Sequence, residues 1–176
     1  MLVKAILSLF ACVVISIAIL AMNANSPSPK ETKQHENFTD ISVKDLGKVL
    51  HASPNSKLIM IYATWCPACR HEMPKFASMS LPPNTEKIAI SLDRNKTKLK
   101  NYIRNYDQGD IEWYRIPLPC ENYYCAELKQ EFADIGINYY GGVPYIVFQQ
   151  ANGKIQQRLR LCMFDNSCKT QYRPLY

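Results

Sequence analysis

The sequence lacks the patterns that identify several large classes of ligand-binding protein. It contains no glycine-rich phosphate loop, no internal repeat and no low-complexity tract. It also has no array of interleaved aromatic and basic residues, although its formal net charge is +6. Five basic residues against one acid lie in residues 154–176, and Lys4 adds another positive charge, so the rest of the chain is nearly neutral. These absences argue against a nucleotide-binding loop, a repeat protein and a nucleic-acid-binding surface.

Long apolar runs are scarce as well, and the one exception lies at the start of the chain. Residues 5–22 are apolar except for Ser8 and Ser16, and they follow the basic residue Lys4. A run of this length lies between a signal-peptide core and a membrane-spanning helix. Because no clean Ala-x-Ala cleavage site is present, we expect residues 1–24 to be a signal anchor; a cleaved signal peptide, which would make the protein secreted, is the alternative. In both cases Lys4 stays in the cytoplasm and the remainder is exported.

The residues after this segment divide into a linker and a domain. Residues 25–39 are polar and contain Pro27 and Pro29, which predicts a linker. Residues 40–176 suffice for one compact domain that can fold without disulfides. The chain nevertheless has seven cysteines, which fits an oxidising compartment because cytosolic thiols are kept reduced.

The centre of the domain is the stretch where an apolar run meets two closely spaced cysteines. Residues 58–63 predict a buried strand, and Cys66 and Cys69 follow where a helix should begin. The free N–H groups and the positive dipole end of a helix stabilise a thiolate, so we expect Cys66 to ionise more easily than an ordinary thiol. Pro67 suits the first helical position, because its φ is fixed and its missing N–H would have no helical partner there.

Two residues between these cysteines allow a disulfide to form and break without a large backbone movement. We therefore predict a redox centre in which Cys66 attacks and Cys69 resolves the mixed disulfide. Two alternatives stay open: a zinc site that joins this pair to Cys120 and Cys125, and a redox-inactive domain that only binds partners. Apart from that zinc alternative we expect no metal, and dithiol chemistry requires no dissociable cofactor.

The order of strand and helix patterns predicts the fold class. A short amphipathic helix is expected soon after Asp40, and Asn152-Gly153 predicts a hairpin. The further predicted strands are residues 87–92, 113–118, 145–149 and 155–161, and the further helices are residues 93–106 and 120–135. Strand, helix and strand in alternation are typical of an α/β domain with a central mixed sheet flanked by helices.

Residues 63–74 read ATWCPACRHEMP, and this string resembles the active site of the thioredoxin superfamily, in particular its TlpA-like branch. That branch contains membrane-anchored thiol-disulfide reductases of bacterial cytochrome c maturation. The resemblance implies a thioredoxin-like fold on the periplasmic face of the cytoplasmic membrane, with exported cysteine-containing proteins as substrates. It also implies a membrane or periplasmic dithiol protein as electron donor. Reduction is the implied direction, with oxidation or isomerisation of secreted proteins as the alternative.

The same resemblance assigns roles to further residues. It implies that Val143-Pro144 is a cis peptide that faces the cysteines and shapes the substrate-binding surface, and it gives Trp65 and Pro67 supporting places beside Cys66. Many thioredoxins carry a buried aspartate six residues before the first cysteine, where this chain has Met60. Methionine cannot accept a proton, so Glu72 is the expected replacement, and a solvated charge near the helix start is the alternative.

Four of the other cysteines are close in sequence in two pairs. We expect the local disulfides Cys120–Cys125 and Cys162–Cys168, because each closes a short loop of exported chain. Cross-pairing, such as Cys120 with Cys162, stays open because tertiary distances cannot be read from the sequence. Each pair could be a structural link or a second redox relay.

Overall fold

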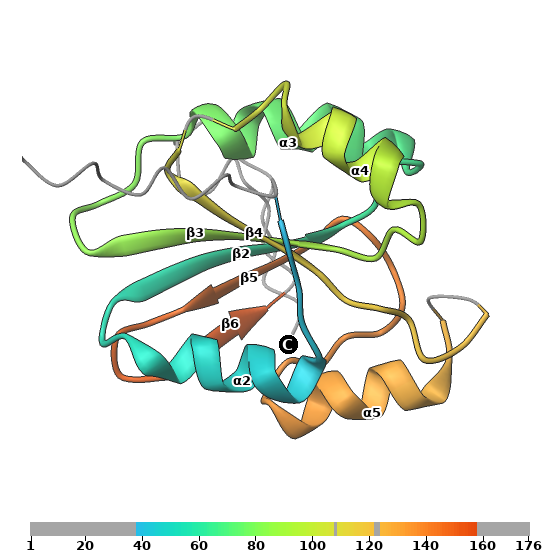
Figure 1. Ribbon diagram of the computed structural model, residues 1–176. Helices are drawn as coiled ribbons and strands as arrows, with labels where there is room; N and C mark the ends of the chain where they lie inside the picture. The colour runs from blue at the N-terminus through green and yellow to red at the C-terminus, as the bar shows by residue number, and fades with distance from the viewer. Residues whose placement is uncertain (1–37, 108, 122–123, 158–176) are drawn as a thin grey trace, which may run out of the picture. The chain divides into compact units, whose positions relative to one another are not determined.

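A computed structural model describes residues 38–107, 109–121 and 124–157. The predicted anchor, most of the predicted linker and the Cys162–Cys168 pair lie outside these residues. In the described ranges, no helix is long and apolar enough to cross a membrane. The described residues form a domain built on one central sheet (Figure 1).

The sheet has six strands in the order β1-β4-β3-β2-β5-β6. Strands β1, β4, β3 and β2 run parallel, and β5 and β6 are antiparallel to their neighbours. The bounds are β1 Thr39–Asp40, β2 Ser56–Tyr62, β3 Thr85–Ser91, β4 Ile111–Arg115, β5 Tyr145–Gln149 and β6 Ile155–Gln157. This is the predicted mixed sheet, with the hairpin turning at Asn152-Gly153.

Helices of the described residues cover both faces of the sheet, as Figure 1 shows. One face carries α3 and α4, and the other carries α2 and α5. The bounds are α2 Val43–Ala52, α3 Pro67–Ser78, α4 Lys96–Ile103 and α5 Ala126–Asp134. A strand between two such layers is buried on both sides, which explains why its sequence is continuously apolar rather than alternating.

Strand β2 shows how the alternation of side chains serves both layers. Leu58, Met60 and Tyr62 pack with residues of α3 and α4, whereas Ile59 and Ile61 pack with residues of α2 and α5. All five side chains are fully buried. Burial of each aliphatic side chain contributes about 1.5–3 kcal/mol, so this strand anchors the segment that follows it.

The structure corrects the bounds of three elements that the sequence patterns predicted. Strand β4 begins at Ile111 and ends before the expected residues 116–118, and α4 begins at Lys96 rather than at residue 93. Helix α5 begins at Ala126, so Cys120 lies in the preceding loop and Cys125 is the N-cap. Asparagine at position 95 explains the later start of α4, because its side chain accepts a hydrogen bond from the Lys98 N–H and caps the helix there.

The edge strand β1 was not predicted, since two residues carry no periodicity. It pairs with β4 and is fastened by Arg115, whose Nε and Nη2 atoms donate to the two carboxylate oxygens of Asp40 at 2.6 and 2.7 Å. Lys96 from α4 forms a second ion pair with the same carboxylate. Arg115 is nearly buried, so this bidentate pair is screened less than an ordinary surface pair.

We expect Asp40→Asn to lower the free energy of unfolding by about 0.5–1 kcal/mol near neutral pH. The hydrogen bond from Arg115 lowers the pKa of Asp40, so the stabilisation is complete above the unfolded-state pKa of about 3.9 and is lost as the pH falls through the folded-state pKa. Urea unfolding at several pH values tests this. Glu131→Gln, which removes the same charge from an exposed position on α5, should show no such loss. A deficit in Asp40→Asn that persists undiminished in acid would contradict this explanation.

Candidate active site

The two central cysteines lie at the carboxyl end of β2, where the chain turns into α3. Cys66 is the N-cap of α3, and Pro67 takes the first helical position, as predicted. The backbone N–H of Cys69 donates to Cys66 Sγ at 3.4 Å. Cys66 Sγ thus accepts a hydrogen bond from one of the N–H groups that the start of a helix leaves without a helical partner.

The predicted cis peptide also lies at this site. The Val143–Pro144 bond is cis, and the Val143 carbonyl oxygen accepts a hydrogen bond from Cys66 Sγ at 3.4 Å. Residues 77 positions apart in the sequence therefore meet at the sulfur. Val143 and Pro144 are partly exposed and the neighbouring Trp65 is 47% exposed, so together they form the surface around Cys66.

The two thiols differ in their surroundings. Cys66 is 7% exposed, whereas Cys69 is fully buried in the apolar cluster that also contains Met60. Burial raises the pKa of the Cys69 thiol well above its ordinary value, and the adjacent Cys66 adds to this effect. Cys69 therefore favours its protonated form, and Cys66 is the more accessible of the two thiols.

Asp93 is a site residue that the sequence patterns did not single out. Its carboxylate accepts hydrogen bonds from Thr64 N–H at 2.9 Å, from Thr64 Oγ1 at 2.6 Å and from Ser91 Oγ at 2.7 Å. The register of the parallel strands explains the meeting, because Tyr62 lies opposite Ser91 and two more residues along each strand lead to Thr64 and Asp93. The signal that could have identified Asp93 is its place directly after a predicted buried strand. Because the carboxyl ends of parallel strands share one edge of a sheet, residues that follow two such strands lie close together.

Glu72 lies on α3 but binds cations rather than a thiol. Its carboxylate is 2.9 Å from Lys75 Nζ and 3.0 Å from His71 Nδ1. Partial burial by itself would raise the pKa of Glu72, but the hydrogen bonds from Lys75 and His71 lower it overall. A carboxylate with a lowered pKa is a weaker base, so these contacts favour the alternative of a surface charge over that of a proton acceptor.

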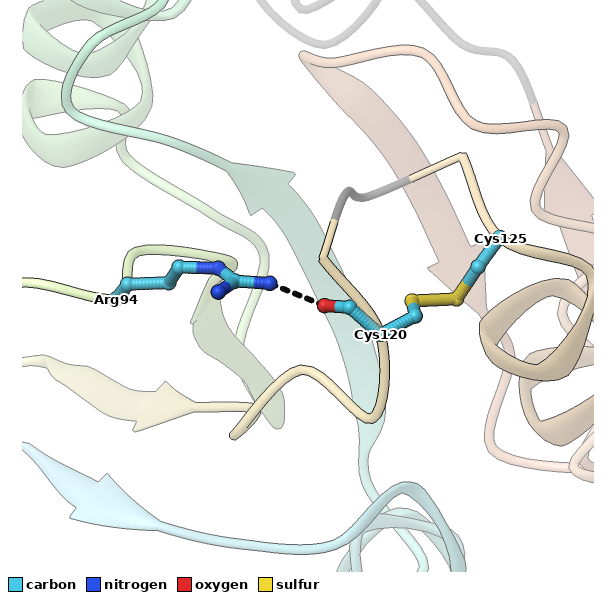
Figure 2. Close-up of a disulfide and its surroundings, with 3 residues drawn as sticks. All are labelled: Arg94, Cys120 and Cys125. Atoms are coloured by element: carbon cyan, nitrogen blue, oxygen red, sulfur yellow. Dashed lines mark hydrogen bonds between the residues drawn. A yellow bond between two sulfur atoms is a disulfide. The ribbon is translucent and has the colours of Figure 1, made fainter.

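The structure contains the expected Cys120–Cys125 disulfide, drawn in Figure 2. A sulfur in a disulfide is not a thiolate ligand, so these two cysteines cannot complete a zinc site with Cys66 and Cys69 in this state. Figure 2 also shows the guanidinium of Arg94, which follows Asp93, donating to the Cys120 carbonyl oxygen. The loop that the Cys120–Cys125 disulfide closes, here termed the disulfide loop, is thus joined at Cys120 to the loop that leads from β3 into α4.

The disulfide loop also contacts the loop before the cis peptide. Gly141 has a φ of +99°, and a Cβ at this position would lie 2.7 Å from Tyr124 Cδ1. Only glycine combines this backbone conformation with the required space. Gly141 therefore allows the chain before Val143 to lie close to Tyr124.

With this geometry in view, the sequence comparison defines the class of the protein. The chain matches the thioredoxin-like family over residues 55–155, which is more than half of its length. The chain therefore belongs to the thioredoxin-like family. No curated protein sequence matches it closely enough to add a particular relative.

Solved structures of similar fold come from several bacteria. A secreted Mycobacterium tuberculosis disulfide oxidoreductase, described as homologous to Escherichia coli DsbE, is 14% identical with a TM-score of 0.44, over 60% of this chain and 69% of that one. A Chlorobium tepidum thiol:disulfide interchange protein is 23% identical with a TM-score of 0.43, over 60% and 69%. StoA from Bacillus subtilis is 11% identical with a TM-score of 0.44, over 65% and 82%.

Proposed function

We propose that the protein is an extracytoplasmic reductant of disulfides in exported proteins, with Cys66 as nucleophile and Cys69 as resolving thiol. The observation that carries this proposal is the asymmetry of the pair. Cys66 lies at the start of α3 beside the exposed Trp65, and Cys69 is fully buried one helical turn later. An attacking thiol must be reached by the substrate, whereas a resolving thiol needs to reach only its neighbour.

The reaction has two exchange steps. The Cys66 thiolate attacks one sulfur of the substrate disulfide, that S–S bond breaks, and the second substrate sulfur leaves as a thiolate that takes up a proton. Cys69 then loses its proton and attacks the Cys66 sulfur of the mixed disulfide, which releases the first substrate sulfur as a thiol. The substrate gains two electrons and Cys66–Cys69 becomes a disulfide, which a dithiol protein of the membrane or periplasm reduces again.

The surface around Cys66 suits an extended polypeptide. Val143 and Pro144 are partly exposed beside the sulfur, and backbone groups of such a loop can pair with an extended segment that carries the substrate cysteine. The direction of electron flow is supported by the resemblance of residues 63–74 to the TlpA-like string.

We expect Cys69→Ala to accumulate mixed disulfides with exported proteins through Cys66, because the resolving thiol is absent. Non-reducing gels of affinity-purified protein, followed by peptide mapping, would identify the cysteine that holds each partner. Cys66→Ala is the matched control, and it should trap little because the remaining Cys69 thiol is buried and has a raised pKa. Equal trapping by the two variants would contradict the assigned roles.

The reduction potential tests the direction. We expect the Cys66–Cys69 couple to lie near the reducing end of the thioredoxin range, about −270 mV, rather than near the oxidising end at about −120 mV. Equilibration with glutathione buffers and quantification of alkylated Cys66 would measure it. A variant with Cys120→Ser and Cys125→Ser isolates this couple from the second disulfide. A value near the oxidising end would reverse the direction and favour an oxidase.

The location is tested by a reporter enzyme that is active only after export, fused after Asn37. We expect activity from a chain that retains residues 1–24, because that apolar segment should direct export. The control fusion begins after residue 24 and should be inactive. An active control, or an inactive full-length fusion that is nevertheless synthesised, would remove the basis for an extracytoplasmic site.

A further inference from the structure

A cavity of about 380 Å³ lies directly beside the active site and has no role in the dithiol exchange itself. Three segments enclose it. One wall is formed by Thr64 and Trp65, which directly precede Cys66. The second wall is the segment from Leu92 into the first turn of α4. The third is formed by Leu118, which precedes the disulfide loop, and by Glu121 within that loop. Trp65 directly precedes Cys66 in the sequence, so the cavity lies close to the residue that forms the mixed disulfide.

The walls are apolar and the exposed rim is charged. Trp65, Leu92 and Leu118 supply the apolar surface. Arg94 and Lys98 are exposed cations at the rim, and Glu121 is the exposed acid opposite them. Asp93 also borders the cavity, but it is 3% exposed and its carboxylate accepts hydrogen bonds from Thr64 and Ser91. The exposed charge at the rim is therefore net positive.

Contacts outside the cavity hold its third wall in place. Arg94 donates to the Cys120 carbonyl, and the disulfide then links Cys120 to Cys125 at the N-cap of α5 (Figure 2). At Cys120, the wall that carries Leu118 is thus attached both to the loop after β3 and, through the disulfide, to the N-cap of α5. A cavity with fixed walls binds a side chain without the cost of ordering a loop.

We propose that this cavity is a specificity subsite, which accepts a bulky apolar side chain close to the reactive cysteine of a substrate whose neighbouring residues are acidic. The proposal rests on the proposed function and names the class of polypeptide that the site prefers. The apolar walls suit one large aliphatic or aromatic side chain, and the rim cations Arg94 and Lys98 complement acidic neighbours. An extended chain advances about 3.3 Å per residue, so the side chain lies within about three residues of the cysteine.

The test uses synthetic peptides whose single cysteine carries a coloured aromatic thiol in a mixed disulfide. Attack by the Cys66 thiolate on the cysteine sulfur expels the coloured thiolate and forms the peptide–Cys66 disulfide, which Cys69 then resolves. One series places phenylalanine at each of three positions on either side of the cysteine in an acidic background. Two partner series carry serine at the same positions, or lysine in place of the acids. The readout is kcat/KM from the release of colour by the reduced full-length protein.

At one or two positions we expect phenylalanine to raise kcat/KM at least about tenfold over serine, since burial of a large apolar side chain contributes roughly that factor or more. Acidic neighbours should give a further severalfold advantage over lysine, and added salt should reduce it. Leu118→Trp fills the cavity and should abolish the preference for phenylalanine. Lys98→Glu should reverse the charge preference while the preference for phenylalanine remains.

A matched control is Lys44→Glu, which changes the same charge at an exposed position on α2, on the opposite face of the sheet. It should leave both preferences unchanged. The double variant Cys120→Ser with Cys125→Ser should weaken the discrimination, because the third wall loses its attachment to α5. Equal rates for phenylalanine and serine peptides in the wild type, or full discrimination in Leu118→Trp, would overturn the subsite. Failure of the wild-type protein to react with every peptide would instead overturn the proposed function.

Discussion

The site depends on the parallel register between β2 and β3. Seven residue pairs align from Ser56 with Thr85 to Tyr62 with Ser91, and continuing this register brings Thr64 to Asp93. The carboxylate of Asp93 then fixes both the N–H and the hydroxyl of Thr64, only two residues before Cys66. Because a parallel register cannot slip by one residue without turning every buried side chain to the wrong face, the position of Cys66 is set by the core itself.

Burial gives the two cysteines different properties although they share one helical turn. Met60 replaces the carboxylate that many thioredoxins place beneath the pair, and the cluster around Cys69 is apolar as a result. An apolar cluster holds the second thiol in its neutral form, so the second exchange step depends on how its proton leaves. Glu72 is engaged by Lys75 and His71. The residue that accepts this proton is therefore better sought outside α3.

The fold and the central pair were predictable from the sequence because both depend on local patterns. Continuous apolar runs marked β2 and β3, Asn-Gly marked the hairpin, and a strand followed by Cys-Pro-Ala-Cys marked the helix start. The Val143–Pro144 cis bond followed from a family resemblance rather than from any local signal. Asp93 was missed because its partner Thr64 lies 29 residues away in the sequence and meets it only through the register of β2 and β3. Strand β1 was missed because it has only two residues. The cavity beside Trp65 could not be predicted, because its three walls come from segments that only the folded chain brings together.

The spacing within α3 also bears on how the cysteine pair tolerates oxidants. A peroxide that reaches the surface thiol converts it to a sulfenic acid, and further oxidation of that group is irreversible. Cys69 lies three residues further along the helix, with its own N–H directed at Cys66 Sγ. Its thiol can condense with the sulfenic acid, which releases water and leaves the same disulfide that the normal cycle produces. Damage at the Cys66 sulfur thereby returns to the exchange cycle, and the complete burial of Cys69 keeps the rescuing thiol out of reach of the oxidant.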